Sequence, residues 1–138
     1  MRESTFEAQF GKMVKRLGGL SYKWVSPGNA GVPDRIVFFP PGTWIHKTLV
    51  EGIWFVELKS TKGRLTPRQV HQHDRLRQRG ARVLTLWPDT HQYVPVSLQF
   101  VTAVSLCLAR LSLETNTATP PRTKVHQYED VCTGSEEV

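Results

Sequence analysis

The chain of 138 residues (15.7 kDa) has the size of one domain and is long enough to bury a hydrophobic core without disulfide bonds or structural zinc. Its two cysteines, Cys107 and Cys132, form no CxxC or Cys/His pattern, which argues against a disulfide scaffold and against a zinc finger. The formal charge of +6 favours a polyanionic partner and is unevenly distributed, because residues 1–112 carry 16 Lys plus Arg and seven Asp plus Glu (net +9), whereas residues 113–138 carry two and five (net −3).

The first half of the chain predicts a helix followed by three strands. Ser4 and Glu7 have the spacing of a capping box, and apolar residues then recur with helical spacing up to Gly18, which predicts a helix over residues 5–17. The strands follow at residues 22–25, 35–39 and 53–59, with a turn at 26–31 and, at 44–50, a less decided segment that is a candidate hairpin partner of the last strand.

The second half predicts two helices separated by a strand. Thr66, Pro67 and Gln69 supply a cap, a proline at the first helical position and a glutamine at the third. We expect this helix at residues 67–79, ended by Gly80, and then a strand at 82–86 and a helix at 97–111. The order α-β-β-β-α-β-α is typical of an α/β fold with a mixed β-sheet flanked by helices. We expect the domain to cover residues 1–112, and residues 113–138 to form a disordered acidic tail.

Three charged residues at strand ends form the candidate chemical site. Asp34 directly precedes one predicted strand, and Glu57 and Lys59 lie near the end of another, two residues apart and therefore on one face. If the strands are neighbours, the two carboxylates converge and repel each other unless a cation lies between them. A hard divalent cation such as Mg²⁺ binds through one or two carboxylates, and a lysine beside it can orient an attacking water. Strands also often end in charged residues that simply reach solvent, which is the alternative explanation.

Four motifs follow one another along the chain: Gly31-Val32-Pro33-Asp34, Phe55-Val56-Glu57-Leu58-Lys59, Gly63-Arg64-Leu65-Thr66-Pro67-Arg68-Gln69 and Gly80-Ala81-Arg82-Val83. In combination they resemble the virus-type replication-repair nuclease (VRR-NUC) domain, which belongs to the PD-(D/E)xK nuclease superfamily. The resemblance covers about residues 5–90 and implies a restriction-endonuclease-like PD-(D/E)xK core with Mg²⁺ or Mn²⁺ as the cofactor. It implies Asp34, Glu57 and the backbone carbonyl of Leu58 as metal ligands, with Asp34, Glu57 and Lys59 as catalytic residues.

Two further site residues are implied, and each has a structural alternative. Gln69 matches the glutamine that follows the lysine motif in the family and is implied as a catalytic residue, and a helical wheel places it on the side facing the sheet. It is also the expected capping partner of Thr66. Glu7 matches an acidic residue that many superfamily members direct at the metal, but its role in the predicted capping box explains it almost as well.

Basic residues follow the candidate site along the chain. Arginines recur on one side of the helix predicted at 67–79, and further basic residues flank that helix. The candidate nucleic-acid-binding track consists of Lys62, Arg64, Arg68, Arg75, Arg79 and Arg82. Such a stripe is often a solvated helix face, but its position beside a phosphate-handling site favours contacts to a nucleic-acid backbone.

These patterns together predict a metal-dependent endonuclease that hydrolyses DNA phosphodiester bonds. Small members of the family resemble Holliday-junction resolvases and act as homodimers, which implies branched DNA as the substrate and a role in replication, recombination or repair. The apolar helix at 97–111 is one candidate dimer interface. The alternatives are a non-catalytic nucleic-acid-binding module and a nuclease acting on flaps or RNA.

The sequence also bears on the cellular location of the protein. No apolar stretch is long enough for a signal peptide or for a membrane span. We therefore expect a cytoplasmic protein, associated with nucleic acid, in a bacterial or phage-infected cell. We expect no membrane partner and no nucleotide cofactor.

Overall fold

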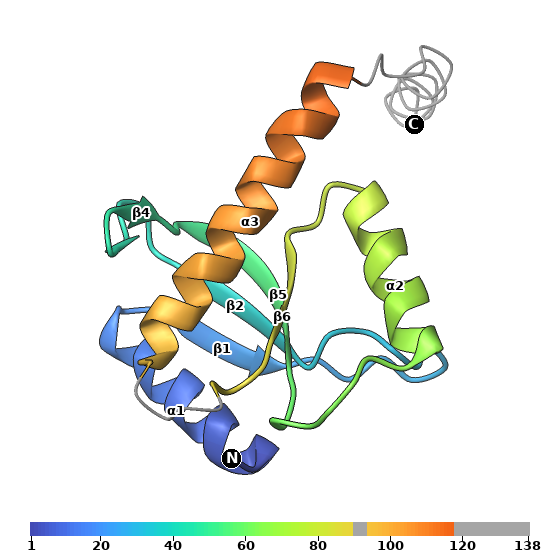
Figure 1. Cartoon of the computed structure of the whole chain (residues 1–138), viewed down its shortest axis with the longest axis horizontal. Helices are drawn as coiled ribbons and strands as arrows, with labels where there is room; N and C mark the ends of the chain where they lie inside the picture. The colour runs from blue at the N-terminus through green and yellow to red at the C-terminus, as the bar shows by residue number, and fades with distance from the viewer. Residues whose placement is uncertain (90–93, 118–138) are drawn as a thin grey trace, which may run out of the picture. The chain divides into compact units, whose positions relative to one another are not determined.

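The computed structural model describes residues 1–89 and 94–117, with side chains up to residue 112 (Figure 1). In this part of the chain the helices are α1 (Glu3–Arg16), α2 (Pro67–Gln78) and α3 (Val96–Thr117). The strands are β1 (Leu20–Lys23), β2 (Arg35–Phe39), β3 (Trp44–Ile45), β4 (Thr48–Leu49), β5 (Gly52–Leu58) and β6 (Val83–Leu86). Among these described helices, none is long and apolar enough to cross a membrane.

Four strands form one mixed sheet in the order β1-β2-β5-β6. β2 is antiparallel to both of its neighbours, whereas β5 and β6 are parallel because α2 connects them as a crossover helix. The predicted mixed sheet and the predicted order of its elements are confirmed. β2 has the predicted bounds, and β1 lies two residues closer to the N-terminus than the strand predicted at 22–25.

The candidate pairing of segment 44–50 with β5 is wrong. β3 and β4 instead form an antiparallel hairpin of their own, and β5 is already paired on both edges, with β2 and β6. His46 and Lys47 close this hairpin with positive φ angles of 46° and 65°. The hairpin joins the end of β2 to the start of β5, and these are the strand ends farthest from Asp34 and Glu57.

α1 begins earlier than predicted, and the predicted capping box is absent. The residue preceding the helix is Arg2, no side chain caps its first turn, and Ser4 lies inside the helix. The predicted apolar face is confirmed, since α1 buries Phe6, Phe10, Met13 and Val14.

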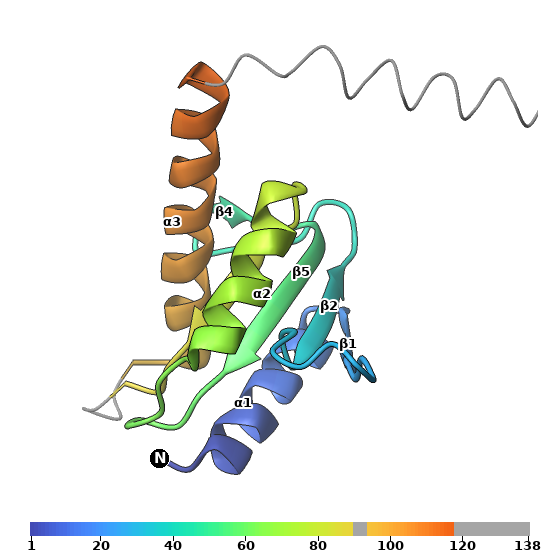
Figure 2. The same ribbon diagram turned by 90° about the vertical axis from the view of Figure 1, so that its right-hand side faces the viewer.

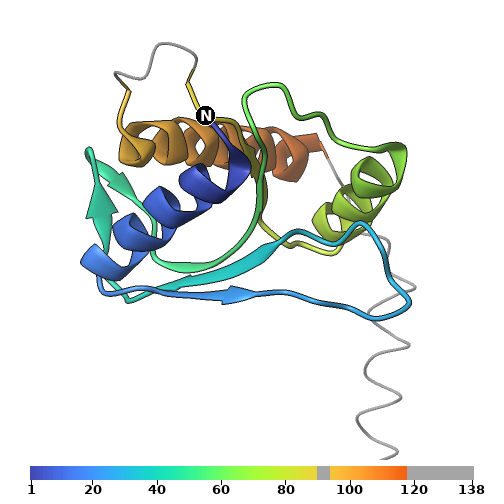
Figure 3. The same ribbon diagram turned by 90° about the horizontal axis from the view of Figure 1, so that it is seen from below.

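The hydrophobic core lies on the side of the sheet that faces α1 and the first turns of α3 (Figure 3). Alternation along the strands sends Val37 and Phe39 of β2 and Trp54 of β5 to this side. The Phe100 ring of α3 lies 5.6 Å from that of Phe39 and 6.1 Å from that of Trp54, measured between centroids. α2 lies against the opposite face of the sheet, over β5 and β6 (Figure 2). The site described below is on that opposite face.

α3 continues past the predicted end at residue 111 as far as Thr117. The chain divides within this helix, between Leu108 and Ala109, and every feature discussed below lies in Met1–Leu108. The predicted tail therefore begins inside α3, at residue 113. The remainder of the predicted tail, residues 118–138, lies outside the described residues.

Candidate active site at the ends of β2 and β5

Asp34 and Glu57 lie side by side where β2 and β5 separate. The strand register pairs Arg35 with Val56, so Asp34 and Glu57 occupy the next positions along it. At these positions each carboxylate accepts a hydrogen bond from a backbone N–H group of the neighbouring strand segment. Asp34 N donates to Glu57 Oε2 at 3.0 Å, and Leu58 N donates to Asp34 Oδ2 at 3.3 Å. The two carboxylates therefore converge, as their placement at the strand ends predicts.

Lys59 and Gln69 complete a hydrogen-bonded cluster around Glu57. Gln69 Nε2 donates to Glu57 Oε1 at 2.8 Å, and Lys59 Nζ donates to Gln69 Oε1 at 2.9 Å. Lys59 Nζ also lies 3.6 Å from Glu57 Oε1. Glu57 and Lys59 leave β5 on the face covered by α2, and Gln69 reaches them from the first turn of that helix. The side chains of Glu57 and Lys59 are 3% and 12% exposed, so this cluster is largely shielded from water.

Gln69 caps α2 and also contacts the cluster, while its catalytic role stays a prediction. Its backbone N–H donates to Thr66 Oγ1 at 3.2 Å, and its Oε1 accepts from Thr66 N at 2.9 Å, which completes the predicted capping box. The same Oε1 accepts from Lys59, and the amide nitrogen remains free to bind Glu57. The start of α2 and the lysine are therefore held by one side chain.

The electrostatics of the cluster are dominated by Glu57. The pKa of Glu57 is raised from 4.5 to about 7, because burial and, to a lesser extent, the negative charge of Asp34 raise it by more than the positive charge of Lys59 lowers it. Two acids and one ammonium therefore share a largely dehydrated space. A second positive charge placed between the carboxylates would relieve their repulsion and stabilise the ionised form of Glu57.

The donor set fits a hard divalent cation. Asp34 and Glu57 supply carboxylate oxygens, and the peptide of Leu58, which Asp34 already contacts, offers a carbonyl oxygen beside them. Within the residues that the structure describes, no group of three or more His, Cys, Asp or Glu side chains is placed to hold a metal ion. Two carboxylates, one carbonyl and solvent match the usual ligands of Mg²⁺, which retains several waters. Zinc, which is softer than Mg²⁺, is usually bound through histidine nitrogen or cysteine sulfur, and this cluster offers neither.

Glu7 stands apart from this cluster. Its carboxylate forms an ion pair with the Arg35 guanidinium, and both side chains are partly exposed. Arg35 alternates with Asp34 and therefore points to the α1 side of the sheet, together with Val37. The Glu7 side chain therefore neither caps α1 nor bonds to Asp34 or Glu57. Its role as a metal ligand stays a prediction.

The predicted basic track is divided by the structure. Lys62, Arg64, Arg68, Arg75 and Arg79 are all exposed, on α2 and on the loop that leads into it. Trp87 anchors that loop by donating from Nε1 to Gly63 O at 2.6 Å. Arg82 is used differently. It donates to the carbonyls of Ile53 and Glu51, and its guanidinium lies 3.7 Å from the centroid of the Trp54 ring. A contact of Arg82 with nucleic acid stays a prediction.

Two further residues shape this region but are not among the predicted site residues. Gly31 has a φ of 98°, and a Cβ there would lie 2.7 Å from the carbonyl oxygen of Arg68, so a glycine lets the turn before Asp34 approach the start of α2. Its place in the Gly31-Val32-Pro33-Asp34 motif was the available signal. His73, one turn after Gln69, is fully buried between α2 and the sheet, and burial lowers its pKa to about 4, so its imidazole is neutral.

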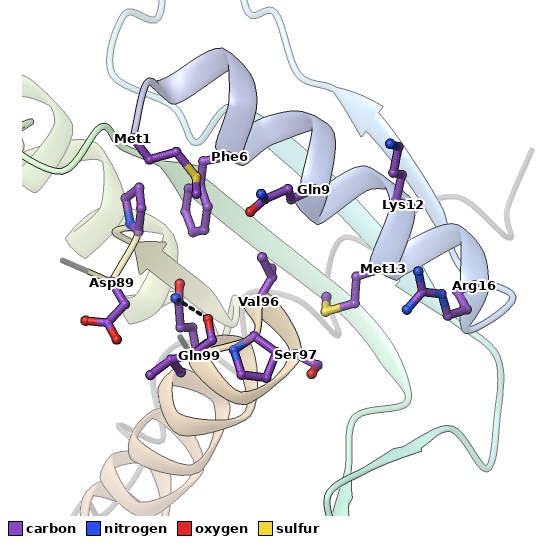
Figure 4. Close-up of a pocket in the computed structure, with 13 residues that line it drawn as sticks. Met1, Phe6, Gln9, Lys12, Met13, Arg16, Asp89, Val96, Ser97 and Gln99 are labelled. Atoms are coloured by element: carbon purple, nitrogen blue, oxygen red, sulfur yellow. Dashed lines mark hydrogen bonds between the residues drawn. The ribbon is translucent and has the colours of Figure 1, made fainter. Parts of the chain in front are cut away.

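A hollow of about 380 Å³ lies elsewhere in the described structure, between α1 and the start of α3 (Figure 4). Phe6, Gln9, Met13 and Gln99 are among its lining residues, and none of the predicted site residues lines it. It is on the α1 side of the sheet, opposite the carboxylate cluster, and we do not connect it with the chemistry of that cluster.

Comparisons with known proteins agree with the geometry. No family model matches the chain. The chain is 40% identical over 86 residues to "Putative nuclease p44" of Acyrthosiphon pisum secondary endosymbiont phage 1, an alignment that covers 62% of this chain and 83% of the phage protein. A solved structure named "VRR_NUC domain" is similar with a TM-score of 0.50 and 30% sequence identity, covering 65% of this chain and 87% of that one.

Proposed function

The chain belongs to the VRR-NUC family of nucleases, and from this premise we propose that it is a metal-dependent endonuclease that hydrolyses DNA phosphodiester bonds and prefers branched DNA. The observation that carries the proposal is the Asp34, Glu57, Lys59 and Gln69 cluster, in which two carboxylates and an ammonium are held together by hydrogen bonds of 2.8–3.3 Å.

The residues of this cluster have distinct proposed roles. Asp34, Glu57 and the carbonyl of Leu58 would hold Mg²⁺ or Mn²⁺, and the bound cation would polarise the scissile phosphate and offset its charge. Lys59 Nζ keeps donor capacity beyond its bond to Gln69, so it can orient the attacking water and stabilise the negative charge that develops on the phosphoryl oxygens. Gln69 positions that ammonium, and both groups contact Glu57 Oε1.

The exposed basic residues Lys62, Arg64, Arg68, Arg75 and Arg79 are the proposed contacts to the DNA backbone. Their side chains are solvent-accessible on the helix and loop that adjoin the cluster. Contacts to phosphates position a duplex without reading its sequence, which suits an enzyme that selects DNA by shape. A homodimer, with α3 as one candidate interface through Leu98 and Leu106, remains part of this proposal, because two sites would allow paired cuts.

Cleavage assays test the proposal directly. Labelled four-way, flap and linear duplex DNA, and an RNA duplex, would be incubated with the protein in Mg²⁺, in Mn²⁺ or in EDTA. We expect cleavage in both metals, no cleavage in EDTA and the highest rate on four-way DNA. Cleavage that survives EDTA would contradict the metal mechanism. Binding to DNA without cleavage in either metal would favour a non-catalytic binding module, and a higher rate on flaps or RNA would replace the substrate proposed.

Replacing both Arg75 and Arg79 by alanine should weaken DNA binding and make it less dependent on salt. Each lost phosphate contact lowers the slope of log K against log salt by about one, so we expect a slope reduced by about two. Affinities measured by fluorescence anisotropy over a salt series give this slope. The matched control is the exposed pair Lys12 and Arg16 on α1, also replaced by alanine, because these residues lie away from the track. An unchanged slope in the first variant would remove this side of α2 from the DNA contact.

A further inference from the structure

An aromatic surface adjoins the candidate active site on the same face of the sheet. Tyr22 lies on β1, Trp24 directly follows it, Phe38 lies on β2, and Phe55 lies on β5. The register and the alternation of side chains place all four rings on the face that also carries Glu57. Trp24 and Phe55 have ring centroids 5.4 Å apart, and those of Tyr22 and Phe38 are 6.0 Å apart. We call these four residues the aromatic shelf.

The aromatic shelf begins directly beside the carboxylates. Trp24 N donates to Asp34 O at 2.7 Å, so the tryptophan is the cross-strand neighbour of the first carboxylate. Phe55 precedes Glu57 by two residues on β5 and therefore stands next to it on the same face. A nucleotide whose phosphate reached Asp34 and Glu57 would bring its base, or that of its neighbour, close to these two rings.

The aromatic shelf is accessible to a ligand. Tyr22 is 56% exposed, and the rings of Trp24, Phe38 and Phe55 are partly exposed. The described helices do not cover β1 and β2 on this side, because α1 and α3 lie on the other face (Figure 3). α2 lies over β5 and β6, beside the aromatic shelf (Figure 2). Leu20 and Ile53, 53% and 47% exposed, extend the apolar surface away from the carboxylates.

We propose that the aromatic shelf binds unpaired nucleobases next to the scissile phosphate by stacking; this inference rests on the proposed nuclease function and adds to it the part of the substrate that is recognised. A base inside a duplex already stacks on both of its faces, so it must give up that stacking to contact a protein ring. An unpaired base can stack on a protein ring without this cost. The aromatic shelf therefore favours DNA with unpaired or distorted nucleotides at the cut. The occupant is nucleic acid because the rings adjoin a phosphate-directed cluster on a domain whose first 112 residues carry a net charge of +9.

The test compares two DNA duplexes of the same sequence, one fully paired and one with three unpaired nucleotides at the cleavage position. Tyr22→Ala should lower cleavage of the second duplex about tenfold and leave the first within about twofold. Tyr22→Phe, which keeps the ring, should retain the wild-type rate, which separates loss of stacking from misfolding. The matched control is Trp44→Ala, because Trp44 is an equally exposed aromatic (59%) on the β3–β4 hairpin.

A binding measurement distinguishes the failure of this inference from the failure of the proposed function. With 2-aminopurine in the unpaired run, wild-type protein in EDTA should quench or enhance its fluorescence by stacking, and Tyr22→Ala should reduce the change, because one of the four rings is lost. Stacking without cleavage in any metal would refute the nuclease proposal and retain the aromatic shelf. Cleavage with an unchanged 2-aminopurine signal, or equal losses on both duplexes, would overturn the aromatic shelf. A wild-type dimer that Tyr22→Ala converts to a monomer, measured by analytical ultracentrifugation, would also overturn it and assign this face to a second copy of the chain.

Discussion

Replacing Asp34 by asparagine is expected to lower the rate of DNA cleavage by on the order of a thousandfold or more, with little change in DNA affinity. The asparagine oxygen can still accept the hydrogen bond from Leu58 N, so the end of β2 keeps its contact with β5. The change removes the negative charge that would hold the metal ion against the phosphate. Single-turnover cleavage of four-way DNA in Mg²⁺ gives the rate, and anisotropy in EDTA gives the affinity.

Asp74→Asn is the matched control for this variant. Asp74 is an exposed aspartate on α2 that pairs with Arg77 at 3.4 Å, and it is outside the cluster. Its replacement should leave cleavage within about twofold. Asp34→Asn protein that cleaves at more than a tenth of the wild-type rate would refute the proposed role of Asp34, and a large loss of DNA affinity would assign it to binding.

Replacing Glu57 by glutamine is expected to abolish cleavage and, in the absence of metal, to remove a pH-dependent loss of stability. In the folded protein the Glu57 pKa is about 7, against 4.5 in the unfolded chain. Between these values the folded state keeps a proton that the unfolded state releases, so the free energy of unfolding falls as the pH rises from 4.5 to 7. A shift of this size corresponds to up to about 3 kcal/mol for a carboxylate that is almost fully buried.

The measurement is urea denaturation in EDTA at several pH values from 4.5 to 8, for the wild type and Glu57→Gln. From the lowest to the highest pH, the unfolding free energy of the variant should increase relative to that of the wild type by up to about 3 kcal/mol. The absolute difference also includes the lost acceptor for Gln69, so the pH dependence is the decisive quantity. Glu51→Gln, which replaces a carboxylate outside the cluster that accepts a hydrogen bond from Gly42 N, serves as the control. A constant difference across the range would show that Glu57 titrates normally.

Much of the site was predictable because its residues lie on regular elements with strong local signals. The bounds of β2 and the capping of α2 followed from composition and from Thr66, Pro67 and Gln69. Alternation along β5 then placed Glu57 and Lys59 on one face, and antiparallel pairing with β2 brought Asp34 beside them. Local propensity and sheet periodicity agree at these positions, so nothing from distant parts of the chain overrides them.

The errors arose where a partner distant in sequence decided the outcome. Glu7 had the spacing of a capping box, but the ion pair with Arg35, 28 residues away, engages its carboxylate. Local sequence likewise does not predict that the Arg82 guanidinium contacts the Trp54 ring and two backbone carbonyls. The segment at 44–50 is a candidate partner of β5 because it is adjacent in sequence, although both edges of β5 are taken by other strands. None of these partners can be identified from local sequence.

The β3–β4 hairpin has a practical consequence for protein engineering. It connects the ends of β2 and β5 that are remote from Asp34 and Glu57, and its His46–Lys47 turn is the point where the chain reverses. A fluorescent reporter or a guest DNA-binding module inserted at this turn would lengthen the connection without altering the register that holds the two carboxylates together. The turn is therefore the natural position for building this nuclease into larger fusion proteins.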